Sequence, residues 1–163
     1  MSNPFIITRL LNAPRNVVWD VYTKAEHLAH WLGPKGSKIT YCKLDFKVGG
    51  TFLYAMEFNG MIMWAKWQFK EIVAPEKVVL IQCFSDENGG ITQHPMAPDW
   101  PSQTHSTTTL VEQNGKTLLT LEWLPYNATP EQIAVFNASF DSMNQGWGGN
   151  FDVLDDYLNS IQK

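Results

Sequence analysis

Hydrophobic and polar positions along this chain repeat in two different ways. From Ser37 to Phe84 the repeat is two residues, as in strands that bury one face. Before and after the β-rich part of the chain, near residues 15–32 and 130–161, apolar residues recur three and four positions apart, which is typical of helices. The pattern therefore predicts strands in the middle of the chain and helices on either side.

Turn signals divide the middle of the chain into short strands. The segments "KITYCKLDF", "TFLYAMEF", "MIMWAKWQFKEI" and "KVVLIQCF" are followed by "HSTTTLVEQ" and "KTLLTLEWL". Asn59-Gly60 and Asn114-Gly115 predict two-residue hairpins, because both positions of such a turn favour positive φ. With "PFIITRLL" near the start, the chain has seven predicted strands.

The helical parts carry their own start and stop signals. A short helix is expected after Pro14, and a second one over Ala25–Leu32 ends at Gly33-Pro34. Thr129 is a suitable N-cap for the last helical region, with a proline next and a glutamine three residues on. Strands in succession with helices segregated predict one α+β domain over residues 1–163 with an antiparallel sheet.

Three glycines surround Trp147 in the last predicted helix, although each costs about 1 kcal/mol against alanine. We hypothesise that Gly146 and Gly148 thin the flanks of the helix, so that it sinks into a curved sheet. Gly146→Leu should then strongly destabilise the fold. The alternative is a kink at Gly148-Gly149. The apolar stripe of this helix is predicted to be Phe136, Phe140, Met143, Trp147, Phe151, Leu154, Leu158 and Ile161.

Charge and composition exclude several classes of function. The net charge is -4 and no Lys/Arg cluster could follow a phosphate backbone, so nucleic acid is not an expected partner. The sequence shows no signal peptide and no apolar stretch that could span a bilayer, so we expect a cytoplasmic protein. Cys42 and Cys83 are isolated and are expected to be reduced.

Candidate catalytic and metal-binding groups are few. His27 and His30 lie beside Glu26 at a spacing that zinc sites use, but further ligands are missing. We therefore expect surface histidines, no metal and no cofactor. Glu71 shares the strand parity of inward residues, and a buried carboxyl group could act as a general acid, unless a bulge at the strand end turns it outward.

The aromatic content is 13%, including seven Trp, and it indicates either a thick core or a lined cavity. Apolar and aromatic walls with few polar groups are typical of small-molecule sites. The predicted cavity residues are Trp31, Tyr54, Met56, Met63, Trp67, Phe69, Trp123, Phe136, Phe140, Met143 and Trp147. The long segment Ser85–Thr104 is expected to be a structureless loop, either functional or a mobile surface insert.

Six segments of the chain resemble a known family when taken in order. They are "APRNVVWDVYT", "AEHLAHWLGPKG", "LDFKVGGTFLY", "FKEIVAPEKVV", the segment "SDENGG…HPMAPDWP", and "NATPEQIAVFNASFDSMNQGWGGNFDVLDDYL". The chain resembles the SRPBCC, or START-like, superfamily, and within it the homologues of the activator of heat-shock-protein-90 ATPase. The resemblance implies a helix-grip fold, with a seven-stranded antiparallel sheet curled around the C-terminal helix, two short helices after the first strand, and a cavity between helix and sheet.

Three functions are compatible with these features of the chain. We favour a non-enzymatic domain that binds a small hydrophobic or aromatic molecule, with the two short helices and the 85–104 segment as a gate. A cyclase, dehydratase or hydrolase would use the same cavity, with Glu71, His105 and Tyr54 as candidate groups. A chaperone-interacting module is the third, although we expect no room before the first strand for the further N-terminal domain of the activator. A homodimer also remains open.

Overall fold

One antiparallel sheet organises the chain. The computed structural model describes residues 3–94 and 97–162. The strand order is β1-β8-β7-β5-β4-β3-β2, and a two-residue strand, β6, pairs with the end of β5. The strands are β1 (Phe5–Leu11), β2 (Lys38–Leu44), β3 (Thr51–Phe58), β4 (Met61–Val73), β5 (Lys77–Ser85), β6 (Ile91–Thr92), β7 (Gln103–Gln113) and β8 (Lys116–Tyr126). The helices are α1 (Arg15–Thr23), α2 (Ala25–Trp31), α3 (Pro130–Asn137) and α4 (Phe140–Ile161).

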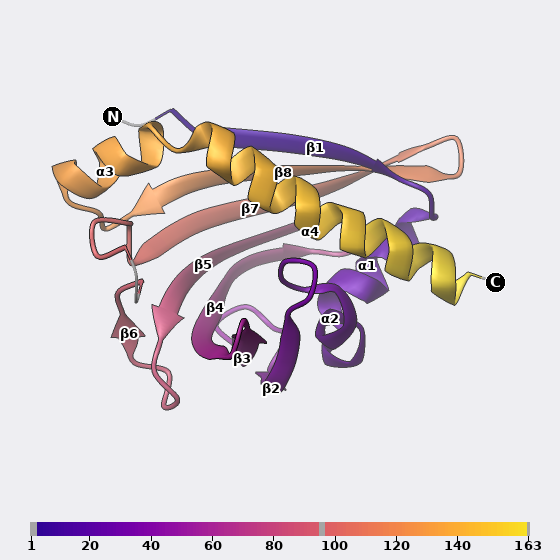
Figure 1. The fold of residues 1–163 in the computed structure, drawn as a ribbon. Coiled ribbons are helices and arrows are strands. Elements are labelled where there is room, and N and C mark those ends of the chain that lie inside the picture. The colour runs from indigo at the N-terminus through magenta and orange to yellow at the C-terminus, as the bar shows by residue number, and fades with distance from the viewer. Residues whose placement is uncertain (1–2, 95–96, 163) are drawn as a thin grey trace.

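The sheet curls, and α4 lies along its concave side (Figure 1). Helices α1 and α2 lie toward the C-terminal end of α4, and α3 lies toward its N-terminal end (Figure 1). The predicted α+β class, the antiparallel sheet and the helix grip are therefore confirmed, with β6 and α3 as additions to the predicted order.

The two predicted hairpin turns are present between consecutive strands. Asn59 has a φ of 53° and Gly60 one of 79°, and Asn114 and Gly115 have φ values of 52° and 81°. Positive φ at both central residues is what a type I′ turn requires. Each turn therefore joins its strands with a twist that matches the sheet.

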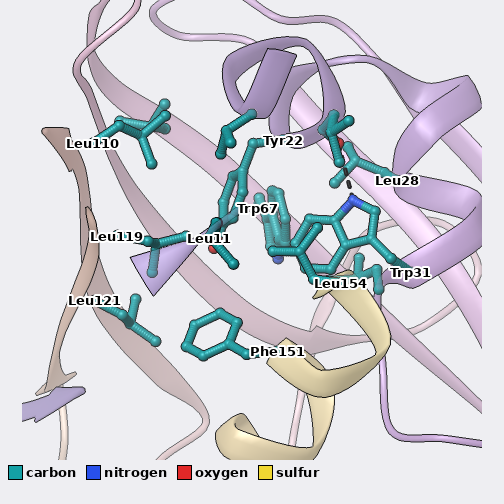
Figure 2. Close-up of a cluster of buried hydrophobic side chains, with 14 of the residues drawn as sticks. Leu11, Tyr22, Leu28, Trp31, Trp67, Leu110, Leu119, Leu121, Phe151 and Leu154 are labelled. Atoms are coloured by element: carbon teal, nitrogen blue, oxygen red, sulfur yellow. Dashed lines mark hydrogen bonds between the residues drawn. The ribbon is translucent and has the colours of Figure 1, made fainter. Parts of the chain in front are cut away.

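The main core lies between the sheet, α4 and the two short helices (Figure 2). Leu119 and Leu121 of β8 pack in one cluster with Phe151 and Leu154 of α4. Trp31 of α2 is only 1% exposed, and its indole N–H donates to the Val21 carbonyl at 2.9 Å. Helices α1 and α2 thus form part of the core, and their role as a gate stays a prediction.

The last helical region consists of two helices and not one. A capping box starts α3: the Gln132 N–H donates to Thr129 Oγ1 at 3.2 Å, as the sequence predicts. Helix α3 ends at Asn137, and Ala138 and Ser139 separate it from α4. The Ser139 hydroxyl donates to the Val135 carbonyl at 2.6 Å. A serine that bonds back to the preceding turn competes with continued helix.

The predicted apolar stripe is correct in its centre and wrong at its ends. Met143, Phe151, Leu154 and Leu158 of α4 are buried. Phe136 belongs to α3, so it lies on a different helix from the rest. Ile161 is 40% exposed because it lies at the last position of α4.

Both explanations of the glycines are wrong. Helix α4 continues through Gly146, Gly148 and Gly149 without a break, which contradicts the kink. A Cβ atom at any of the three would meet nothing within 4 Å, so the flanks of the helix are open and not crowded. The Gly148 carbonyl accepts from Arg9 Nη2 at 3.2 Å. This acceptor belongs to the backbone, so the hydrogen bond does not depend on which side chain stands at position 148.

Gly149→Ala should therefore stabilise the protein. Alanine lowers the backbone entropy of the unfolded chain, which is worth about 1 kcal/mol in a helix interior. For a domain of this size that corresponds to a rise in Tm of about 2–4 °C. Thermal denaturation followed by circular dichroism would measure it. The matched control is Gly60→Ala, which should lower the Tm because φ is 79° there.

Candidate functional site

A pocket of about 520 Å³ lies between the first half of α4 and the sheet. Strands β3, β4, β5 and β8, the segment after α2 and the segment between β6 and β7 supply the other walls. Its volume is in the range of small-molecule sites. The lining residues are Leu32, Gly33, Pro34, Tyr54, Met56, Trp67, Gln82, His94, Ala97, Trp100, Trp123, Ser139, Ser142, Met143, Gly146, Trp147 and Asn150.

Aromatic rings form much of the pocket wall and brace one another. The ring centroids of Trp123 and Trp147 are 5.7 Å apart and nearly perpendicular, and Trp100 lies 6.1 Å from Trp123. On another part of the wall, Tyr54 and Trp67 meet edge to face at 5.9 Å. Such contacts stabilise each pair of rings beyond simple burial. These contacts therefore hold the aromatic rings of the wall against one another.

The segment 85–104 is mainly a loop, as the sequence predicts, but local contacts order parts of it. Asp86 Oδ1 accepts from the Asn88 and Gly90 N–H groups at 2.8 and 2.9 Å, which forms a tight turn before β6. Trp100 packs 5.7 Å from Phe136, and Ala97 lines the pocket beside it. The prediction of a long loop is therefore correct for most of the described segment, but β6 and the packed Trp100 give it more order than a structureless loop has. Residues 95 and 96 lie outside the described residues.

Six of the eleven predicted cavity residues line this pocket: Tyr54, Met56, Trp67, Trp123, Met143 and Trp147. Each lies on an inward position of β3, β4 or β8, or on the sheet-facing side of α4. This placement agrees with the parity argument made from the sequence. Their role in binding a ligand stays a prediction.

The other five predicted cavity residues lie elsewhere. Trp31, Phe69 and Phe136 are buried in the hydrophobic clusters, at 2% exposure or less. Phe140 packs against Phe5 with the ring centroids 5.6 Å apart. Met63 lines a smaller hollow on β4. Parity along a strand places a side chain on the inner face, but it does not distinguish a filled part of that face from a hollow one.

The three groups named for catalysis do not form an acid–base site. Glu71 is exposed and pairs with Lys77 at 2.7 Å, because a register shift between Phe69 and Glu71 turns it outward. His105 alternates with the buried residues Thr104 and Ser106, so it lies on the outer face of the sheet. Tyr54 alone lines the pocket, and burial raises the pKa of its hydroxyl well above the ordinary value.

The histidines of α2 have partners on α4. His27 Nδ1 lies 2.7 Å from the Tyr157 hydroxyl, and the His30 ring stacks on Tyr157 at 5.3 Å. Across the described residues, no cluster of His, Cys, Asp and Glu could hold a metal ion. The two histidines therefore help to attach α2 to α4.

The pocket lining is uncharged in the part of the chain that the structure describes. No Asp, Glu, Lys or Arg is among the lining residues that the structure describes. Burial lowers the pKa of His94, which favours the neutral form of its ring. The Tyr54 hydroxyl stays protonated, because burial raises its pKa. The polar groups of the pocket are thus neutral donors and acceptors.

Two indole N–H groups of lining residues have no hydrogen-bond partner within the described part of the chain. Nε1 of Trp67 and Nε1 of Trp123 are buried and unpaired among the described residues. The Tyr54 hydroxyl lies close enough to Trp67 to offset part of the pKa rise that burial causes, but the two groups do not reach hydrogen-bond geometry. Buried donors without partners are rare in native proteins and costly.

Several lining residues were absent from the sequence prediction. Asn150 is buried on α4, where its Oδ1 accepts from the Gly33 N–H at 3.0 Å and its Nδ2 donates to the Trp31 carbonyl at 2.8 Å. Its place within one turn of Trp147 and Phe151 was a usable signal. Trp100 follows two prolines and gave none, since no periodicity surrounds it.

A second hollow, of about 390 Å³, lies between the end of α2 and the second half of α4. Lys35, Asp152 and Asp156 are among its lining residues. Its charged rim suits an apolar molecule less well than the aromatic pocket does. None of the helices within residues 3–94 and 97–162 combines the length and hydrophobicity that a membrane span requires.

Comparison with known proteins adds a family and a fold. The family model "Activator of Hsp90 ATPase homolog 1-like protein" matches residues 12–159. A search of curated proteins found no match to the chain.

Solved structures resemble the chain over most of its length. A crystal structure of a Mycobacterium smegmatis protein has a TM-score of 0.76 at 21% identity, covering 94% of this chain and 88% of that one. A Nitrosomonas europaea protein gives 0.75 at 23% identity, with 98% and 96% covered. An NMR structure of a Staphylococcus epidermidis protein gives 0.75 at 25% identity, with 99% and 92% covered. The Mycobacterium smegmatis and Nitrosomonas europaea proteins are less than 25% identical to this chain, so their similarity shows a shared fold alone.

Proposed function

The chain belongs to the activator of Hsp90 ATPase homolog 1-like family, and we propose that it is a binding domain for a small, largely apolar or aromatic molecule. The observation that carries the proposal is the pocket of about 520 Å³ between α4 and the sheet. Four tryptophans and two methionines are the largest apolar side chains of its lining, and neutral polar groups lie between them. Such a mixture favours burial of an apolar ligand in one orientation.

The properties of the wall support binding over catalysis. Proton transfer at neutral pH needs a group whose pKa lies near 7, held within reach of the substrate. Glu71 and His105 do not line the pocket, and the pKa of Tyr54 is raised by burial. Methionine at two positions, Met56 and Met143, suits a site that adapts to the shape of its ligand.

Titration of the intrinsic tryptophan fluorescence tests the proposal. Four of the seven Trp side chains line the pocket and should report on binding: Trp67, Trp100, Trp123 and Trp147. The purified protein would be titrated with a fatty acid, a flavonoid, a steroid and a small aromatic compound. We expect saturable quenching by at least one uncharged aromatic compound, with a stoichiometry of one per chain.

Native mass spectrometry of the same sample provides an independent readout. A bound molecule would add its mass to the folded chain and would be lost on denaturation. If no compound of the panel quenches the fluorescence saturably and no added mass appears, the pocket is not a small-molecule site.

A further inference from the structure

We propose that Gln82 selects the ligand of the pocket, and that this ligand is an uncharged molecule with an N–H group and a carbonyl oxygen side by side, as in a carboxamide or a lactam. This inference deepens the proposed function and rests on it. It adds the chemistry of the ligand's polar end and the residue that recognises it, in place of a plain hydrocarbon, a ketone or an anion.

Gln82 lies on the sheet side of the pocket. It lines the pocket from β5 and pairs in register with Trp67 of β4 on one side and Thr104 of β7 on the other. Residues directly opposite each other in neighbouring strands share a face of the sheet, so Gln82 lies on the same inner face as Trp67. The nearest positions of β5 on this face, Leu80 and Phe84, are apolar. An amide therefore interrupts an apolar row at the pocket.

Polar side chains on the helix side of the pocket already have partners. The Ser139 hydroxyl donates to the Val135 carbonyl at 2.6 Å. The amide of Asn150 accepts from one backbone group and donates to another, at 3.0 and 2.8 Å. Ser142 is exposed, so water can bond its hydroxyl. These three groups have little to gain from a ligand.

The side-chain amide of Gln82 has no hydrogen bond to any residue that the structure describes. The side chain is half-buried. Its oxygen and nitrogen are not among the fully buried, unpaired atoms of the described residues, which are the two indole nitrogens. Both groups of the Gln82 amide are therefore accessible from the pocket, where water or a ligand can bond them.

A ligand that covers Gln82 has to replace the hydration of this amide. An apolar surface would leave its donor and its acceptor without partners, which lowers affinity. A ketone oxygen would accept from the amide N–H but would leave the carbonyl oxygen of Gln82 unpaired. A carboxamide or lactam accepts and donates at neighbouring atoms, so it can bond both groups.

The uncharged lining decides between a neutral and an ionised polar end. A buried carboxylate or phosphate would lose its hydration and find no Lys or Arg among the described lining residues. A buried ammonium group would likewise find no Asp or Glu there. A neutral amide bears a much smaller desolvation cost.

Tyr54 is the other polar side chain on the sheet side of the pocket. It is 5% exposed, and the Trp67 N–H lies near its oxygen. What Tyr54 offers a ligand is therefore one O–H donor, which serves a ketone and an amide equally. A preference for the amide over the ketone points to Gln82.

Three probes with one ring system test this inference. They are 2-naphthamide, 2-acetylnaphthalene, in which a methyl group replaces the NH₂ group, and 2-naphthoate, which is anionic. Affinities would be measured by isothermal titration calorimetry at pH 7. On the unmodified protein we expect the amide to bind about two- to tenfold more tightly than the ketone, as one further net hydrogen bond implies, and more tightly than the anion.

Gln82→Met keeps the length of the side chain and removes its amide. The ratio of amide to ketone affinity should then fall to one or below, because the N–H of the buried ligand loses its acceptor. Gln68→Met is the matched control, since Gln68 of β4 is exposed and is not a lining residue. Tyr54→Phe should lower the ratio less than Gln82→Met does. Because each ratio compares two ligands on one variant, general packing losses cancel.

The outcomes separate the two proposals. If the ketone or the naphthoate binds the unmodified protein at least as tightly as the amide, the inference is overturned while the binding function stands, without reliance on variants. A ratio that Gln82→Met leaves unchanged, or that Tyr54→Phe lowers equally, also overturns it, because the polar end of the ligand is then bonded elsewhere. If none of the three probes binds, the proposed function and the inference fail together.

Discussion

Gly146→Leu should remove ligand binding while the fold stays at least as stable as before. Gly146 lines the pocket from α4, and a Cβ atom there would meet nothing within 4 Å. An added isobutyl group is expected to enter the apolar pocket, since burying apolar surface is worth about 25 cal/mol per Å². Leucine is also a better helix former than glycine by about 0.8 kcal/mol. We expect affinity for the best ligand of the panel to fall about tenfold or more.

Gly149→Leu is the matched control for this experiment. It lies on the same helix, makes the same chemical change and meets equally open space, but it does not line the pocket. Fluorescence titration should find its affinity unchanged, and thermal denaturation should find both variants folded. Equal ligand affinity in the two variants would show that binding takes place outside the pocket. A large loss of stability in Gly146→Leu alone would revive the crowded-flank hypothesis, which the open space contradicts.

The fold could be predicted well because its signals are local and repeated. Strand periodicity, the Asn-Gly turns and the capping box at Thr129 each depend on residues a few positions apart, and all are present. The break between α3 and α4 was missed because the apolar spacing runs on through Ala138 and Ser139. A single serine that bonds to the preceding turn leaves no mark on periodicity.

The pocket could be predicted only in part. Inward parity identified Trp67 and Trp123, yet it also included Phe69, which is packed solid. Whether an inner face is filled depends on how far α4 stands from each strand, and no local pattern encodes that separation. The glycines illustrate the difficulty, because the same glycine-rich sequence is compatible with a crowded or an open helix flank. A larger side chain would destabilise the fold in the first case and would be accommodated in the second.

Asn150→Ala should strongly destabilise the fold. Asn150 is 7% exposed and joins α4 to the end of α2 through the Gly33 N–H and the Trp31 carbonyl. The carbonyl is one of the groups that the last turn of a helix leaves without an internal partner. Alanine would leave both buried backbone groups unpaired, at a cost of about 2–4 kcal/mol. Urea denaturation would measure the free energy of unfolding.

Asn144→Ala provides the control, because Asn144 lies on the same helix and is exposed. Its free energy of unfolding should stay within about 0.5 kcal/mol of the unmodified protein. If the two alanine variants lose similar stability, the bridge between α4 and α2 contributes little. Gly33 and Asn150 also line the pocket, so the bridge fixes the position of that wall.

Asn150→Asp would separate the two hydrogen bonds through pH. An ionised carboxylate can still accept from the Gly33 N–H, but it meets the Trp31 carbonyl oxygen with a negative charge and no donor. Only the protonated form can serve both partners, so burial and repulsion raise the pKa of the new carboxyl group in the folded state above its ordinary value of about 4. A raised folded-state pKa means that the folded state binds the proton more tightly than the unfolded state does. The variant therefore loses stability as pH rises from the unfolded-state pKa through the folded-state pKa. Unfolding at pH 4 and pH 8 should therefore show a larger deficit, relative to the unmodified protein, at pH 8. An equal deficit at both pH values would mean that the Trp31 carbonyl does not need the donor that Asn150 provides.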